Sequence, residues 1–370
     1  MHNDDEKDNL PFSPDEIERL LTEKLDIRHI NRRKLISSCL KITGCAILSG
    51  LLLSDNKSSI ADVRWLMGDE KSNSSKPNVK SKTTIVQVSD PKSVDSSGEG
   101  IEGPVMDMLS KAIRELTGEK DIAKAWGRIA MPGQRVGIKV NAISGRHLST
   151  QIPVVMAIVE GLKMAGVKER DIIIWDKTSR ELERAGFQLN ANTDSIRCVG
   201  TNKIGYQDDE QDVNGTKFKL SKILTEEIDV LINVPIMKNH GNAGVTLSLK
   251  NNYGSHNNPS DHHRNNCDPH IANINAHQII RSKTKLIVLD ALRAQCNGGP
   301  RDKPRWKWNP GIILMGFDPV AIDRIGSDII EARRLEVGVK SLGNSHRHII
   351  TAAKLGLGND DRSSISLKKI

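Results

Sequence analysis

The chain has 370 residues, of which 37% are hydrophobic, so it can bury the core of one large domain or of two ordinary ones. Only 3% of the residues are aromatic, so aliphatic side chains must build that core. The net charge is +8, but the sequence has no basic stretch that is interleaved with aromatic residues, and this argues against a nucleic-acid-binding surface. Five cysteines include no C-x-x-C pair, which argues against a disulfide scaffold and a four-cysteine iron–sulfur cluster, although one disulfide could form.

The N-terminal part of the chain resembles an export signal. Arg32 and Arg33 precede a modestly apolar stretch that runs to Leu53 and is interrupted by Lys41. A paired arginine, a polar residue and then an apolar run are the pattern of a twin-arginine signal. A small-x-small cleavage site fits after Ala61. The resemblance implies export to the periplasm by the twin-arginine machinery, with residues 1–61 as the signal region and residues 62–82 as a flexible linker.

Three other interpretations of this N-terminal part stay open. The apolar stretch could anchor the chain in the inner membrane, Cys45 could belong to a lipoprotein signal, or the arginine pair could stand by chance in an unstructured arm. Lys41 shortens the clean apolar run to about a dozen residues, well below the roughly 20 that a membrane span needs. We therefore expect no stable transmembrane span after processing.

Residues 83–357 show apolar strands that alternate with helices, and residues 358–370 read as a polar tail. Strands are predicted over residues 83–88, 135–140, 171–175, 228–234, 286–289 and 312–315. Helices are predicted over residues 104–116, 153–165, 178–185 and 319–332, several of which begin at a proline or end at a glycine. The continuous apolar strands indicate burial on both sides. The pattern predicts an α/β fold with a mostly parallel, doubly wound sheet and helices on both faces.

Polar residues follow most of the predicted strands. In open parallel sheets, ligands bind at the carboxyl ends of the strands. This rule selects Lys139, Asn141, Asp176, Lys177, Lys238, Asn239, His240, Asp290 and Asp318. Asp318 is expected first to cap the helix that begins at Pro319. The alternative is a solvated sheet edge without a ligand, since strand ends carry polar residues in any protein.

The segment from His240 to His270 is rich in metal-binding residue types and holds five of the eleven histidines. Neutral imidazole and thiolate are the preferred ligands of zinc, iron and nickel. A transition-metal site is therefore predicted, with candidate ligands His240, His256, His263, Cys267 and His270. No standard zinc motif matches, so the alternative is a solvated or hydrogen-bonded polar loop.

Lys250 is predicted to be the pivot of an anion or cofactor site. Residues 245–250 are expected to form a short helix whose first N–H groups could bind an anion. The catalytic candidates are Lys250, Asp290 and Asp323, with either aspartate as a general base or as the carboxylate partner that a buried lysine needs. The ligand-binding candidates are Lys139, Asn141, Lys238 and Asn251. The alternative is that Lys250 reaches solvent from a surface helix.

Three stretches together resemble the domain-of-unknown-function family 362: residues 136–141, residues 238–240 followed by residues 246–254, and residues 318–323. The resemblance covers roughly residues 83–356 and implies no established reaction. Some members of that family carry an extra ferredoxin-like segment, whose cysteines this chain lacks, so no such cluster is expected. More distantly, His240 and Lys250 have the ten-residue separation of a histidine and a lysine in lactate racemases, where the lysine carries a nickel-pincer nucleotide.

These features lead to the hypothesis of an exported, metal-dependent enzyme that acts on a small anionic substrate through an unassigned reaction. The alternatives are a non-catalytic accessory protein that holds a metal or ligand, and a distant lactate-racemase-like nickel enzyme. A closed pocket where His240, Lys250 and a carboxylate converge would favour the enzyme. An open site beside an exposed apolar patch would favour the accessory protein.

Overall fold

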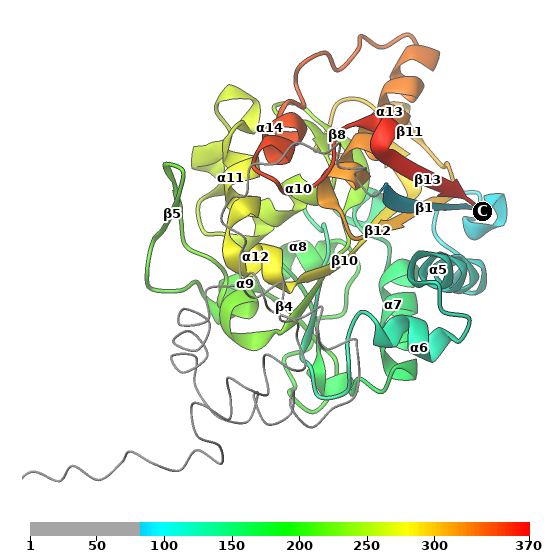
Figure 1. The fold of residues 1–370 in the computed structure, drawn as a ribbon, viewed down its shortest axis with the longest axis vertical. Coiled ribbons are helices and arrows are strands. Elements are labelled where there is room, and N and C mark those ends of the chain that lie inside the picture. The colour runs from blue at the N-terminus through cyan, green and yellow to red at the C-terminus, as the bar shows by residue number, and fades with distance from the viewer. Residues whose placement is uncertain (1–81) are drawn as a thin grey trace, which may run out of the picture. The chain divides into compact units, whose positions relative to one another are not determined.

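The structure is a computed structural model that describes residues 82–370 (Figure 1). The predicted signal region, and the predicted linker apart from its last residue, lie outside the described residues. Within residues 82–370, no helix has the length and apolar character that a membrane crossing requires.

A large mixed sheet is the centre of the described fold. Its main path has the strand order β13-β1-β12-β10-β7-β2-β3-β4. Within this path β12 alone is antiparallel to its neighbours, and all the other adjacent pairs are parallel. The strands of the path are β1 (Thr83–Ser89), β2 (Val136–Lys139), β3 (Ile172–Asp176), β4 (Arg197–Gly200), β7 (Val230–Asn233), β10 (Thr284–Gln295), β12 (Ile312–Gly316) and β13 (Ile365–Lys369).

Short strands extend the sheet beyond the end of β7. The strand β8 (Ile236–His240) continues alongside the second half of β10 and pairs with β9 (Gly244–Thr246), while β11 (Lys307–Trp308) pairs with β10 from the other side. A separate hairpin is formed by β5 (Gln211–Val213) and β6 (Thr216–Phe218). The extension by β8 carries Lys238 past the end of β7, where its side chain reaches Asn141, two residues beyond the end of β2.

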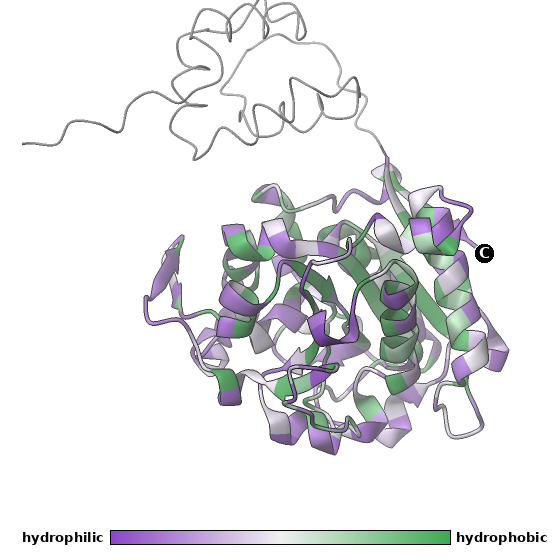
Figure 2. Cartoon of the chain, turned by 90° about the horizontal axis from the view of Figure 1, so that it is seen from below, coloured by the Kyte–Doolittle hydropathy of each residue, from purple (hydrophilic) through white to green (hydrophobic). Residues whose placement is uncertain are grey.

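Helices cover both faces of the sheet. Alternate residues of β1 and β10 belong to two different apolar clusters, so the two clusters lie on opposite faces. One face packs against α5 (Glu102–Thr117), α6 (Ile122–Gly127) and α7 (Ile152–Met164). The other packs against α10 (Ser248–Asn251), α11 (His270–Ala276), α12 (Gln278–Lys283), α13 (Pro319–Glu336) and α14 (His348–Lys354). Figure 2 shows the strands as an apolar layer inside polar outer surfaces.

The predicted α/β fold is confirmed, and so is the cap of α13. The Asp318 carboxylate accepts the N–H groups of Val320 and Ala321, both at 2.9 Å. Three boundaries differ from the prediction. The expected helix over residues 245–250 is instead β9 followed by the short α10. The strand β10 is longer than expected, so Asp290 lies inside it, and part of the predicted polar tail forms β13 beside β1.

Candidate functional site

Three of the four predicted ligand-binding side chains form one buried network at the carboxyl edge of β2, β7 and β8. The Lys238 Nζ donates to Asn141 Oδ1 at 2.8 Å, and Asn141 Nδ2 donates to Asn251 Oδ1 at 3.0 Å. Asn251 Nδ2 in turn donates to Asn233 Oδ1 at 2.7 Å and to the carbonyl of Lys139 at 3.3 Å. Asn233 ends β7, and sequence reasoning missed it although the strand-end rule would have selected it.

The side chain of the fourth residue, Lys139, turns to a different partner. Its Nζ lies 2.7 Å from Asp176 Oδ1, and both side chains are almost fully buried. Asp176 also accepts the N–H groups of Ala142 and Lys177. Gly254 packs directly against this ion pair, because a Cβ there would lie 2.5 Å from Asp176 Oδ1 and 2.7 Å from Lys139 Nζ. Lys139 therefore anchors the ends of β2 and β3 and leaves Lys238 as the unpaired amine.

Lys238 is fully buried among neutral acceptors. Besides Asn141, its Nζ contacts Ser144 Oγ at 2.7 Å and the Leu148 carbonyl at 3.2 Å. Within the described residues no carboxylate lies within ion-pair distance of this Nζ. Burial lowers the pKa of Lys238 to about 7, because the charged form loses its hydration without gaining a counter-ion.

Lys250 is a second buried amine without a carboxylate. Its side chain is 6% exposed, and its Nζ lies 3.3 Å from His263 Nε2 and 3.4 Å from the centre of the Tyr253 ring. His263 Nδ1 lies 2.7 Å from the carbonyl of Pro259, so Nδ1 carries the proton and Nε2 can accept from Lys250. Burial lowers the pKa of Lys250 to about 7. The alternative interpretation, in which Lys250 reaches solvent from a surface helix, is therefore wrong.

The two predicted aspartates do not pair with Lys250. Asp323 takes the N–H groups of Ser248 at 2.7 Å and Leu249 at 3.0 Å, which start α10. Asp290 takes the N–H groups of Gln151 at 2.8 Å and Leu292 at 3.0 Å. The predicted carboxylate partner is therefore wrong, and the predicted anion site at the helix start is already filled by Asp323. A catalytic role for either aspartate stays a prediction.

The histidines of the loop form a row of ring contacts instead of converging on one point. His240 stacks on His263 with ring centroids 5.7 Å apart. The contacts continue in the order His263, Tyr253, His256, His262 and His270. Cys267 is fully buried.

The side chains of the predicted metal ligands are not arranged as a metal site. Within residues 82–370 no group of three or more His, Cys, Asp or Glu side chains could hold a metal ion. His240 Nδ1 accepts the N–H groups of Asn242 and Ala243, each at 3.1 Å. His270 Nδ1 lies 3.0 Å from Thr216 Oγ1. Metal binding by His240, His256, His263, Cys267 and His270 stays a prediction.

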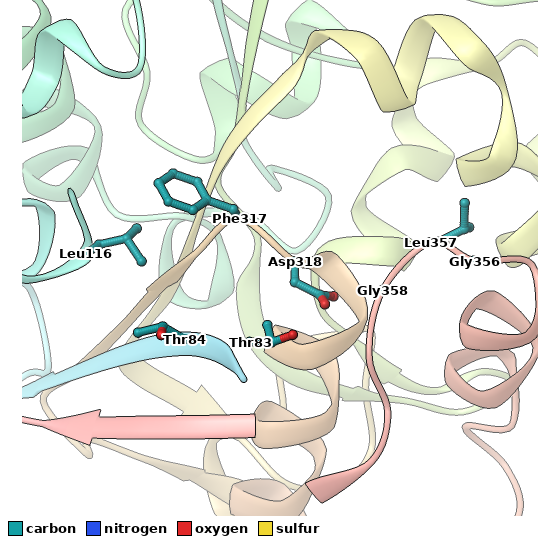
Figure 3. Close-up of a pocket in the computed structure, with 8 residues that line it drawn as sticks. All are labelled: Thr83, Thr84, Leu116, Phe317, Asp318, Gly356, Leu357 and Gly358. Atoms are coloured by element: carbon teal, nitrogen blue, oxygen red, sulfur yellow. The ribbon is translucent and has the colours of Figure 1, made fainter. Parts of the chain in front are cut away.

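Two adjoining cavities were not anticipated, and the smaller one borders the network at Asn233. A groove of about 490 Å³ runs between β1 and the segment around Leu357, and Figure 3 shows Phe317 between Leu116 and Leu357. A smaller cavity of about 130 Å³ shares Phe317 and Leu357 with it. The smaller cavity is lined by Asn233, Asn252, Asn275, Ile280, Arg281, Thr284, Phe317, Pro319 and Leu357. These residues come from separate segments, so no local sequence pattern could have grouped them.

The comparisons with known proteins give a family and no named relative. No curated protein and no solved structure matches the chain. A family model described as "Domain of unknown function (DUF362)" matches residues 136–328, which contain every candidate site residue named from the sequence. This match covers a little more than half of the 370 residues and is narrower than the range of resemblance seen in the sequence. The chain therefore belongs to the DUF362 family.

Proposed function

We propose that this protein is an exported enzyme that acts on a small anionic substrate at the carboxyl edge of the sheet, with Lys250 as its base. The observation that carries the proposal is the pair of buried amines, Lys238 and Lys250, that lack a carboxylate partner among the described residues. A buried ammonium is costly when it is unpaired. An anion that entered beside either amine would supply the counter-charge that this amine lacks.

The surroundings of Lys250 suit proton transfer. An amine whose pKa lies near 7 is about half uncharged at neutral pH, and its uncharged form can take a proton from a bound substrate. The hydrogen bond to His263 and the face of Tyr253 hold the Lys250 amine in place. Lys238 is fixed by Asn141 and Ser144, so its role in this proposal is to hold the anionic group and not to move a proton.

The accessory-protein alternative keeps one specific observation in its favour. His240 and Lys250 both contact His263. No carboxylate of the described residues lies within ion-pair distance of the Lys250 amine. A binding protein needs no base, and the half-exposed Phe317 beside the open groove offers an apolar contact surface. Metal dependence and the lactate-racemase-like cofactor stay predictions, and no step proposed for this site passes through a metal.

The test of the proposed site is calorimetric titration of the full chain with inorganic phosphate at pH 7.5, in two buffers of different ionisation enthalpy. We expect wild-type protein to bind phosphate and to take up protons, because the anion raises the pKa of the lysine that it contacts. Lys250→Met keeps the length and removes the charge, and it should weaken binding at least about tenfold, which corresponds to about 1.4 kcal/mol.

Lys111→Met, at an exposed position of α5, is the matched control and should bind phosphate like the wild type. Binding without proton uptake would show that the anion does not raise the pKa of Lys250, which would contradict the proposed contact between them. Unchanged affinity in Lys250→Met would place the anion site elsewhere and contradict the proposal.

The export part of the proposal is supported by Arg32 and Arg33 ahead of the apolar stretch. Changing both residues to Lys should leave a full-length precursor in the cytoplasm, because the paired arginine is the feature that the twin-arginine route reads. Cell fractionation followed by immunoblotting measures this, with Arg28→Lys as the control that keeps the pair intact. Mature protein in the periplasm of cells that make the double variant would show that the route is wrong.

A further inference from the structure

We propose that the cavity of about 130 Å³ beside Phe317 binds a single-ring aromatic carboxylic acid that also carries a hydroxyl or amino group. Three features of the cavity define this ligand: its size and apolar walls, an unused buried acceptor at Asn252, and an unpaired cation at Arg281. The inference does not rest on the proposed function, because Lys250 and Lys238 line neither this cavity nor the adjoining groove.

The size of the cavity selects one ring. A buried cavity of roughly 150 Å³ accommodates benzene, so about 130 Å³ leaves room for one six-membered ring and for little more. Its apolar walls are Ile280, Phe317, Pro319 and Leu357. Phe317 is 50% exposed and also lines the larger groove, so a ring could enter from that groove and stack on it (Figure 3).

Asn252 supplies the acceptor. Its side chain is 2% exposed, and its Oδ1 has no hydrogen-bond partner among the described residues. The orientation of the amide follows from Asn275, whose Nδ2 donates to the carbonyls of Leu249 and Ile271 at 2.9 and 2.8 Å. Asn275 Oδ1 must therefore accept from Asn252 Nδ2, at 2.7 Å, which leaves Asn252 Oδ1 without a donor. A hydroxyl or amino group of the ligand would supply that donor.

Arg281 supplies the charge. It lies in the last turn of α12, lines the cavity and is exposed, and its guanidinium makes no hydrogen bond or ion pair to another described residue. No acidic residue lines the smaller cavity. Asp318 lines the larger groove, but its carboxylate already accepts the N–H groups of Val320, Ala321 and Asn359. A guanidinium binds a carboxylate through two parallel hydrogen bonds, so the acid group belongs at Arg281.

The experiment is a calorimetric titration of the full chain with 4-hydroxybenzoate. Benzoate lacks the hydroxyl group and phenol lacks the carboxylate, and each should bind about tenfold more weakly or worse than 4-hydroxybenzoate. Arg281→Gln and Phe317→Ala should each weaken binding of 4-hydroxybenzoate to a similar extent. Arg170→Gln changes an exposed arginine that lines neither cavity and should leave the affinity unchanged.

Asn252→Ala should bind benzoate and 4-hydroxybenzoate equally, because it removes the acceptor that distinguishes them. If this variant does not fold, the comparison of the two ligands on the wild-type protein still tests the role of Asn252. Absence of saturable binding of 4-hydroxybenzoate up to about 10 mM would overturn the proposal, because a dissociation constant above this value is too high to indicate a specific site. Equal affinity for benzoate, or an affinity that Arg281→Gln does not change, would overturn it as well.

Discussion

Lys139→Met is expected to lower the free energy of unfolding by about 3–5 kcal/mol, because it leaves the Asp176 carboxylate buried without its cation. The Nζ–Oδ1 distance in the wild type is 2.7 Å, and the side chains are 1% and 6% exposed. Methionine keeps the apolar stem and the approximate volume of lysine, so the loss reports on the charge. Asp176 would retain the N–H groups of Ala142 and Lys177, which offset only part of the cost.

Urea unfolding, followed by circular dichroism, measures this effect. The double variant Lys139→Met, Asp176→Asn removes both charges and should recover part of the stability that the single variant loses. The control is the half-exposed pair of Lys163 and Glu160, where Lys163→Met should cost less than about 1 kcal/mol. A cost for Lys139→Met as small as that of Lys163→Met would show that the buried pair does not hold β2 and β3 together.

The sheet and the network at its carboxyl edge could be predicted from the sequence because both follow from short-range patterns. Continuous apolar runs indicate strands that are buried on both faces, and the carboxyl ends of parallel strands meet at one edge. This is why Lys238 and Asn141 lie in one hydrogen-bonded network although they are far apart along the chain, whereas Asn251 reaches the network from α10. The strand β13 was missed because its sequence, ISLKK, is short and too polar to indicate a strand.

The partners of individual side chains could not be predicted, because they depend on how separate elements pack. Asp323 lies on α13, and nothing near it in the sequence indicates that its carboxylate meets the start of α10. The same holds for Lys250, whose contacts with His263 and Tyr253 arise from the path of the loop between α10 and α11. A dense group of histidines indicates which residue types are near, but not where each ring points.

Asp323→Ala is expected to cost at least about 3 kcal/mol at pH 5, because it leaves the buried N–H groups of Ser248 and Leu249 without an acceptor. The Ser248 hydroxyl also contacts Asp323, and the side chain of Asp323 is fully buried at the junction of α10 and α13. Urea unfolding of the variant and of the wild type measures the difference. Asp328→Ala, at a half-exposed position of the same helix, should cost less than about 1 kcal/mol.

The cost of Asp323→Ala should also depend on pH in a defined direction. Burial raises the pKa of Asp323 to about 7, against about 4 in the unfolded chain. Between these values the unfolded state loses its proton first, so ionisation of this group favours unfolding and wild-type stability falls relative to the variant as the pH rises. The difference between the two proteins should therefore be larger at pH 5 than at pH 7.5. A difference that grows with pH would mean that the three donors around the carboxylate outweigh its burial and lower the pKa of Asp323 in the folded protein.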